Sequence, residues 1–184
     1  YQSKNSFGLL INKEDYLSSS FSGVFGAINN TKSLFFSSLN TYKFSKNYEL
    51  IASLNLARIL PVKSALYIGR ISNVIESSFD IGLQKNKFLF EDDSFAVLIR
   101  QKPYAERGKL DLNLPNGRDT EKNIHYERKS IFLKPSKRNI SLEFIWSRNL
   151  KSGDIGSYIE LSKNSFNTDS PLNFSWLFAY KEKF

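Results

Sequence analysis

Apolar and polar residues alternate with a period of two along this chain, and this alternation limits the fold more than any other feature. Between residues 138 and 148 the odd positions are mostly small or polar. The even positions there are Arg138, Ile140, Leu142, Phe144, Trp146 and Arg148. The pattern returns at the end of the chain, where one face holds Phe174, Trp176, Phe178, Tyr180 and Phe184. Since successive side chains of a β-strand point to opposite sides, each stretch predicts a strand with one apolar face.

Shorter alternating runs and the turn residues between them predict an all-β chain. Alternation also occurs at 48–60, 79–83, 95–99 and 110–114. Turn-forming residues are concentrated at 12–15, 29–32, 45–47, 85–87, 115–117, 134–137, 151–153 and 164–170. We expect about ten antiparallel strands, within a range of eight to twelve. Residues 62–75 are compatible with a short helix or with two strands and a bend.

An antiparallel meander of this size has to protect its two edge strands, and closure into a barrel does so most simply. Its apolar face would meet lipid in an outer-membrane barrel and the core in a soluble sandwich or barrel. Three features favour the membrane version. Aromatic residues gather near strand ends, the opposite face is small and polar, and Phe184 ends an alternating aromatic strand. No apolar run approaches the roughly 20 residues of a membrane-spanning helix.

The chain has no cysteine and one histidine, which removes most routes to catalysis and metal binding. Cysteine nucleophiles, thiolate metal sites and multi-histidine sites are excluded. A Ser-His-Asp triad would need His125, and no Gly-x-Ser-x-Gly motif accompanies it. Acidic clusters at 91–93 and 119–121 lie in predicted turns, where solvated carboxylates are usual. The sequence therefore predicts no enzyme, no cofactor and no metal.

The net charge of +8 is unevenly distributed, because residues 100–138 hold 11 Lys or Arg against 5 Asp or Glu. This segment is a solvated loop face, or it meets anionic lipid headgroups or nucleic acid. No nucleic-acid-binding motif is present, so we expect no nucleic-acid partner. Basic residues on predicted polar faces, among them Arg100 and Arg128, either line a lumen or pair with Glu49, Glu127 and Glu143.

Five short motifs between residues 93 and 148 occur in a recognisable order. They are Asp93-Ser94-Phe95, Arg100-Gln101-Lys102-Pro103, Glu106-Arg107-Gly108, Leu110-x-Leu112-x-Leu114-Pro115 and Leu133-x-Pro135-Ser136-Lys137-Arg138. This order resembles the C-terminal region of autotransporter-like subtilisin-family serine proteases of alphaproteobacteria. It departs from that pattern at Lys102, which is inserted, and at Lys137, where glycine is expected. The resemblance implies a translocator that follows a protease, and no subtilisin motif occurs in these residues. Because the chain starts at Tyr1, we expect the C-terminal module of a longer precursor.

We therefore expect one domain over residues 1–184, an antiparallel meander β-barrel of about 10–12 strands in the outer membrane of a Gram-negative bacterium. It would anchor an N-terminal passenger, take part in its translocation, and contact outer-membrane lipids and the barrel-assembly machinery. The residues expected to face lipid are Phe144, Trp146, Phe174, Trp176, Phe178, Tyr180 and Phe184. Those expected in the lumen are Glu49, Arg128 and Glu143. The alternative is a soluble β-sandwich, a binding or assembly module whose aromatic face forms a core or subunit interface.

Overall fold

The computed structural model describes the chain except residues 13–14, 17–18, 21–30, 62–67 and 183–184. The described residues form antiparallel β-strands and one 3₁₀ turn, η2 (Ser165–Asn167), which confirms the all-β prediction. The strands are β1 (Gln2–Asn12), β2 (Asp15–Tyr16), β3 (Ser19–Ser20), β4 (Thr31–Lys43), β5 (Tyr48–Ile59), β6 (Ile68–Ile71), β7 (Val74–Asn86), β8 (Asp93–Arg107), β9 (Lys109–Arg118), β10 (Ile124–Phe132), β11 (Ile140–Leu150), β12 (Gly153–Lys163) and β13 (Asn173–Glu182). No helix in the described ranges could cross a membrane.

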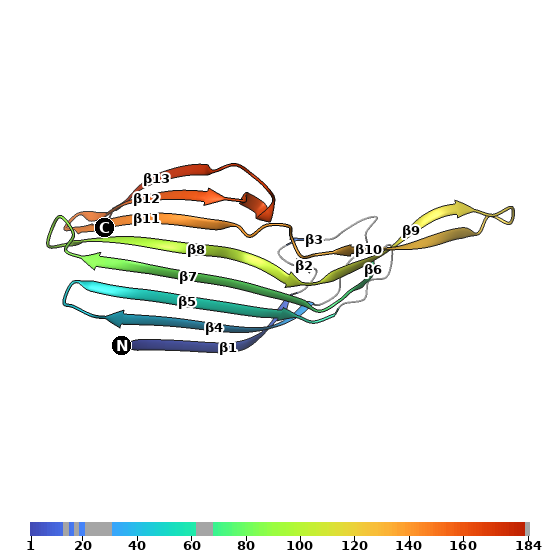
Figure 1. The fold of residues 1–184 in the computed structure, drawn as a ribbon, viewed down its shortest axis with the longest axis horizontal. Coiled ribbons are helices and arrows are strands. Elements are labelled where there is room, and N and C mark those ends of the chain that lie inside the picture. The colour runs from blue at the N-terminus through green and yellow to red at the C-terminus, as the bar shows by residue number, and fades with distance from the viewer. Residues whose placement is uncertain (13–14, 17–18, 21–30, 62–67, 183–184) are drawn as a thin grey trace.

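Eight strands form one curved sheet in the order β1-β4-β5-β7-β8-β11-β12-β13 (Figure 1). We call it the main sheet. All neighbours in it are antiparallel and follow the order of the chain, while β2–β3, β6 and β9–β10 lie outside it between consecutive members. The alternation sets the register, because Phe144 of β11 lies opposite Val97 of β8 and Ile159 of β12. A slip by one residue would move every apolar side chain to the other face.

The two ends of the main sheet differ in their connections. At one end the strands are joined by the short segments 44–47, 87–92 and 151–152. At the other end the connections run over residues 13–30, 60–73, 108–139 and 164–172, of which 13–14, 17–18, 21–30 and 62–67 lie outside the described residues. Figure 1 shows the short turns on the left, where β1 also begins and β13 ends. We call these the short-turn end and the long-connection end.

A second sheet of three strands, in the order β10-β9-β6, extends from the long-connection end (Figure 1). Gly108 joins β8 to β9, and a Cβ there would lie 2.9 Å from Val74 and 3.1 Å from Leu133. The small apolar cluster beneath this junction is formed by Ile59, Ile71 and Val74, with Ala105, Leu110, Leu112 and Leu133 packed around it. This cluster fixes the hairpin of β9 and β10 to the main sheet.

Four of the predicted turns are confirmed, but the prediction at Pro115–Gly117 is wrong, and the one at 85–87 begins too early because Lys85 and Asn86 belong to β7. The predictions at 12–15 and 29–32 lie partly outside the described residues. Residues 45–47, 134–137, 151–152 and 164–170 lie outside the strands, whereas Pro115 and Gly117 pair with Tyr126 and His125 inside the β9–β10 ladder. The register shifts between His125 and Tyr126, so a bulge accommodates the proline. The hairpin turns instead at residues 119–123.

The segment 62–75 lies partly outside the described residues. Its described part consists of β6, a break at residues 72–73 and the start of β7. The strand-and-bend interpretation therefore holds for residues 68–75.

The strands β1 and β13 are the two edges of the main sheet, and each has one neighbouring strand in it. No pairing between β1 and β13 is present among the described residues.

Candidate functional site: a polar network on one face of an apolar sheet

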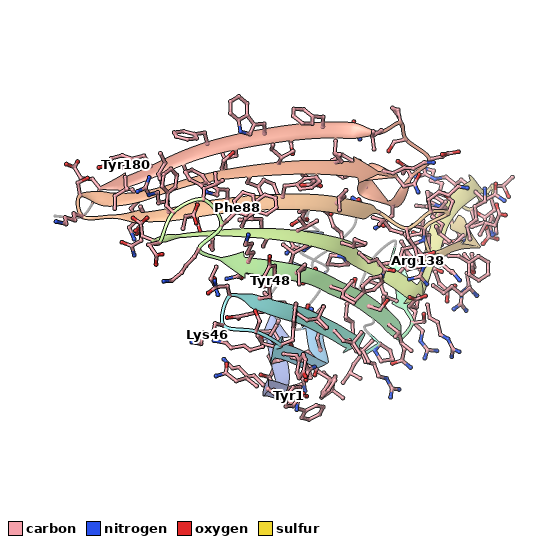
Figure 2. The ribbon with its side chains drawn as sticks, turned by 60° about the vertical axis from the view of Figure 1, so that its left-hand side comes forward. Tyr1, Lys46, Tyr48, Phe88, Arg138 and Tyr180 are labelled. Atoms are coloured by element: carbon pink, nitrogen blue, oxygen red, sulfur yellow. The ribbon has the colours of Figure 1, made fainter. Side chains whose placement is uncertain are left out.

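One face of the main sheet is apolar and exposed from edge to edge, and we call it the apolar face. Figure 2 shows side chains on both sides of the curved sheet, with Tyr180 and Arg138 at opposite ends. Trp176 is 65% exposed and Leu54 is 42% exposed. The further exposed members are Phe7, Leu9, Phe36, Tyr42, Leu50, Leu56, Ile81, Leu83, Ile99, Phe174, Phe178 and Tyr180. Soluble monomers rarely expose an apolar patch larger than a few hundred Å².

The opposite face, which we call the polar face, is buried at its centre, where Ser141 and Glu143 lie. Across the described residues five hydrophobic side chains are buried, and three of them are Ile59, Ile71 and Val74 at the base of the hairpin. Among the described residues eight polar or charged side chains are buried: Thr31, Ser141, Glu143 and Ser162 on the polar face, and Asp93, Gln101, Asp111 and Asn139 elsewhere. Burial is thus reversed relative to a soluble globular domain, where buried positions are mainly apolar.

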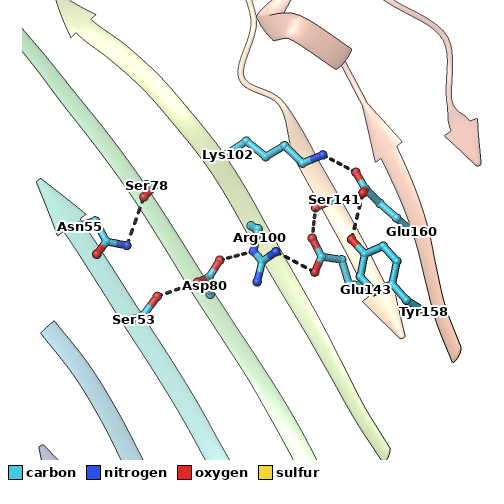
Figure 3. Close-up of polar contacts among 10 residues, drawn as sticks. All are labelled: Ser53, Asn55, Ser78, Asp80, Arg100, Lys102, Ser141, Glu143, Tyr158 and Glu160. Carbon is cyan, nitrogen blue, oxygen red and sulfur yellow. Dashed lines mark hydrogen bonds and ion pairs between the residues drawn. The ribbon is translucent and has the colours of Figure 1, made fainter. Parts of the chain in front are cut away.

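The centre of the polar face is an ion-pair network that crosses four strands (Figure 3). Ser53 of β5 donates to Oδ2 of Asp80 at 2.7 Å, and Nε of Arg100 donates to Oδ1 of Asp80 at 2.6 Å. Nη1 of Arg100 lies 3.1 Å from Oε2 of Glu143, which is completely buried. Ser141 donates to Oε1 of Glu143 at 2.9 Å. A buried carboxylate is tolerated because a cation and a hydroxyl compensate it.

A second part of the network connects β8 with β12. Nζ of Lys102 donates to Oε1 of Glu160 at 2.6 Å, and the Tyr158 hydroxyl donates to Oε2 of the same carboxylate at 2.9 Å. On the other side, Asn55 of β5 accepts from Ser37 at 2.6 Å and donates to Ser78 at 3.3 Å. Polar contacts therefore run across the face from β4 to β12.

Aromatic side chains gather at the short-turn end. Phe44 stacks on Tyr48 with ring centroids 5.8 Å apart, and Phe88 stacks on Phe95 at 4.7 Å. Phe95 in turn lies 6.5 Å from Phe144 of β11. These rings form a band at one level of the sheet.

Trp146 belongs to this band and its polar atom is satisfied. Its Nε1 donates to Oδ2 of Asp93 at 3.0 Å, and Oδ1 of Asp93 also accepts the backbone N–H of Phe88 at 2.6 Å. The backbone N–H of Leu89 donates to the same carboxylate at 3.1 Å. Asp93 thus holds the β7–β8 turn against the indole of Trp146. The indole ring lies on the apolar face, and its N–H points to Asp93 at the short-turn end.

The other predicted apolar-face residues occupy one face, in register with β12. Phe174, Trp176, Phe178 and Tyr180 lie opposite Leu161, Ile159, Ser157 and Ile155 respectively. Phe184 lies outside the described residues.

The structure separates the three residues predicted for the lumen. Glu143 lies at the centre of the polar network, and Glu49 lies at the short-turn end, 3.1 Å from Lys43. Arg128 lies in β10 of the second sheet, where it pairs with Asp111, so the structure does not bring it together with Glu143. Arg100 takes that place, since it pairs with Glu143 as the pairing interpretation of the basic residues expected.

Asp111 and His125 both lie in the protruding hairpin. Hydrogen bonds from the Ser130 hydroxyl and the Arg128 guanidinium lower the pKa of Asp111 to about 2. Nε2 of His125 is 3.7 Å from Oδ2 of Asp119, and its side chain is 65% exposed.

Sequence reasoning missed Asp80, Lys102 and Glu160 as members of the network. Each is a charged residue at a polar-face position, and Asp80 is enclosed by Phe79 and Ile81. A charge in an otherwise apolar alternating run was the available signal. In the described part of the chain, no three His, Cys, Asp or Glu side chains are grouped to hold a metal ion. Comparisons with protein-family models, with curated proteins and with solved structures gave no match to this chain.

Proposed function

We propose that this chain forms the wall of an outer-membrane β-barrel that serves as a membrane anchor. The observation that carries the proposal is the reversed burial: one face of the main sheet is apolar and exposed, and the opposite face holds the network around the buried Glu143. A β-barrel in lipid has this arrangement, because its outward side chains meet hydrocarbon and its inward ones a polar interior.

The unequal ends of the sheet support the same proposal. Outer-membrane barrels have short turns on the periplasmic side and longer loops outside the cell. Segments 44–47, 87–92 and 151–152 would then face the periplasm, and the β9–β10 hairpin would project outward. The aromatic band with Tyr48 and Trp146 would lie at the periplasmic interface, where aromatic rings are enriched.

Barrel closure follows from the proposal, because unpaired backbone groups are too costly in hydrocarbon. The edge strands β1 and β13 are the ends of an even-numbered antiparallel meander, so they run antiparallel to each other. They can pair directly or through further strands. In a narrow barrel the side chains fill the interior, which suits a network that crosses from β4 to β12.

The passenger role rests on the resemblance of residues 93–148 to the C-terminal region of autotransporter-like proteases. The barrel would hold an N-terminal passenger at the cell surface and take part in its export. The barrel-assembly machinery and outer-membrane lipids are the partners that this role requires.

A pair of neighbouring substitutions tests the proposal. Trp176 lies on the apolar face of β13, and Leu177 lies on the polar face of the same strand. We expect Trp176→Lys to cost about 2–4 kcal/mol if it lies near the bilayer midplane, and Leu177→Lys to be tolerated. The wild-type chain should stay in the membrane pellet after washes with salt and carbonate, and enter solution with detergent.

The heat-modifiable mobility of the folded protein in a gel measures the loss. Trp176→Lys should abolish the fast-migrating form and Leu177→Lys should keep it. Release of the wild-type chain by buffer alone would instead favour the soluble module with an aromatic subunit interface. If both substitutions reduced the heat-modifiable form equally, the two faces of β13 would not differ as a lipid face and a lumen face must, and the barrel proposal would be refuted.

A further inference from the structure

A shallow groove lies on the apolar face at the long-connection end. It is lined by Ile99 of β8, Ile140 of β11, Leu161 of β12 and Leu172 from the β12–β13 connection, and it holds about 500 Å³. Small-molecule pockets span roughly 300–1,000 Å³. Ile99 is 47% exposed, Ile140 45% and Leu172 66%, so hydrocarbon surface is open along the groove.

A lysine without a described acidic partner lies at the end of this groove. Lys163 lines it, opposite Ile140 in the β11–β12 register and on the same face as Leu161. Its side chain is exposed, and none of the ion pairs between described residues includes it. The ammonium group is therefore available to an external anion.

The segment that leads into β11 adds positive charge and is held in place. Lys134 and Lys137 are exposed there, and no ion pair among the described residues includes either. The Tyr104 hydroxyl donates to the carbonyl of Pro135 at 2.8 Å. The backbone N–H of Lys137 donates to the carbonyl of Asn167, in the same connection that carries Leu172. The β12–β13 connection therefore contacts the basic segment through Asn167 and lines the groove through Leu172.

We propose that this groove binds a phosphate-bearing anionic lipid, with an acyl chain against Ile99, Ile140 and Leu161 and the phosphate at Lys163. The proposal rests on the proposed function, since it places the groove on the lipid-facing surface. An acyl chain suits the groove because it requires no hydrogen-bonding partner. A peptide strand would need a free sheet edge, and β8, β11 and β12 are paired on both sides.

The test uses the full chain, purified in detergent, with phosphatidylglycerol and phosphatidylcholine of matched acyl chains. Native mass spectrometry measures the bound lipid and thermal unfolding measures the stabilisation. We expect phosphatidylglycerol to bind more tightly. Lys163→Gln should weaken it about fivefold, which corresponds to the contribution of one lysine near an anionic lipid surface. The matched control is Lys151→Gln, an exposed lysine in the β11–β12 turn at the opposite end of the sheet.

A second variant separates the acyl-chain contact from the charge contact. Leu172→Ser should weaken both lipids by the same factor, because Leu172 would touch only the acyl chain. Inorganic phosphate alone should not stabilise the protein, and equal stabilisation by phosphate would indicate an anion site and overturn the lipid proposal. Equal affinity for the two lipids, or equal effects of Lys163→Gln and Lys151→Gln, would overturn it too.

Failure here is distinguishable from failure of the barrel proposal. A protein that resists carbonate but shows no headgroup preference keeps the barrel and loses this site. A protein released by buffer loses the barrel, whatever it binds in detergent.

Discussion

Arg100 and Glu143 should be coupled more strongly than an exposed ion pair of the same chain. Glu143→Ala removes a completely buried carboxylate, which deprives Arg100 of one partner and the Ser141 hydroxyl of its acceptor. Removing one member of a buried ion pair costs about 3–5 kcal/mol. Arg100 is 37% exposed and keeps Asp80 at 2.6 Å, so solvent and the second partner reduce the loss. We therefore expect about 2–3 kcal/mol for Glu143→Ala.

A double-mutant cycle isolates the pairwise part of this loss. Arg100→Ala, Glu143→Ala and the double variant should give a coupling energy of about 1–2 kcal/mol. The control cycle uses Arg148 and Asp92, whose side chains are 28% and 41% exposed and 3.0 Å apart. In this control pair the carboxylate is solvent-accessible, unlike that of Glu143, and ion pairs in contact with solvent contribute about 0.2–1 kcal/mol.

Both cycles can be measured by urea unfolding in detergent micelles, followed by tryptophan fluorescence. A conservative Glu143→Gln variant should lose less than the alanine variant, because its amide oxygen still accepts from Ser141. If the coupling between Arg100 and Glu143 does not exceed the control, the buried network does not stabilise the sheet and the reasoning is refuted.

Three further outcomes are expected around the hairpin and the short turns. The pKa of Asp111 is about 2 in the folded chain, below its ordinary 3.8, so its stabilisation is complete above about pH 4 and disappears as the pH falls through 2. Hydrogen exchange of β9 and β10 should accelerate over that window in the native chain, and an unchanged profile in Asp111→Asn would contradict this origin. Gly108→Ala should loosen the hairpin, because a Cβ there meets neighbouring side chains at 2.9–3.2 Å, and trypsin should then cut β9 and β10 faster. With the other tryptophan replaced by phenylalanine, Asp93→Ala should shift the emission of Trp146 to longer wavelength because it removes the acceptor, and an unchanged spectrum would argue against the indole hydrogen bond.

The sequence predicted the strands and their faces well because alternation is a local property. Phe144 and Trp146, or Phe174 and Trp176, show their common face within a few residues, and the observed registers keep them together. The prediction of a turn at Pro115–Gly117 was wrong because a bulge accommodates the proline inside the β9–β10 ladder. Local turn preference does not reveal whether a ladder continues past such a residue.

Partners across the sheet could not be read from the sequence, because they depend on which strands become neighbours. Arg100 and Glu143 are separated by 42 residues of intervening chain, including all of β9 and β10. Arg128 has the same residue type and a similar alternating context, yet its strand belongs to the second sheet. Only the excursion between β8 and β11 decides which of the two arginines meets Glu143.

The hairpin of β9 and β10 can change in evolution without altering the main sheet. The backbone N–H of Leu133 donates to the carbonyl of Gly108 at 3.0 Å, so the polypeptide leaves the main sheet and returns to it at nearly one point. Topologically, residues 109–132 are an insertion between strands that are already partners. The hairpin can therefore lengthen, shorten or exchange its surface residues over generations while the pairing of β8 with β11 stays fixed. The hairpin, which would face the cell exterior, is thereby separated from β8 and β11, whose pairing sets the register of the main sheet.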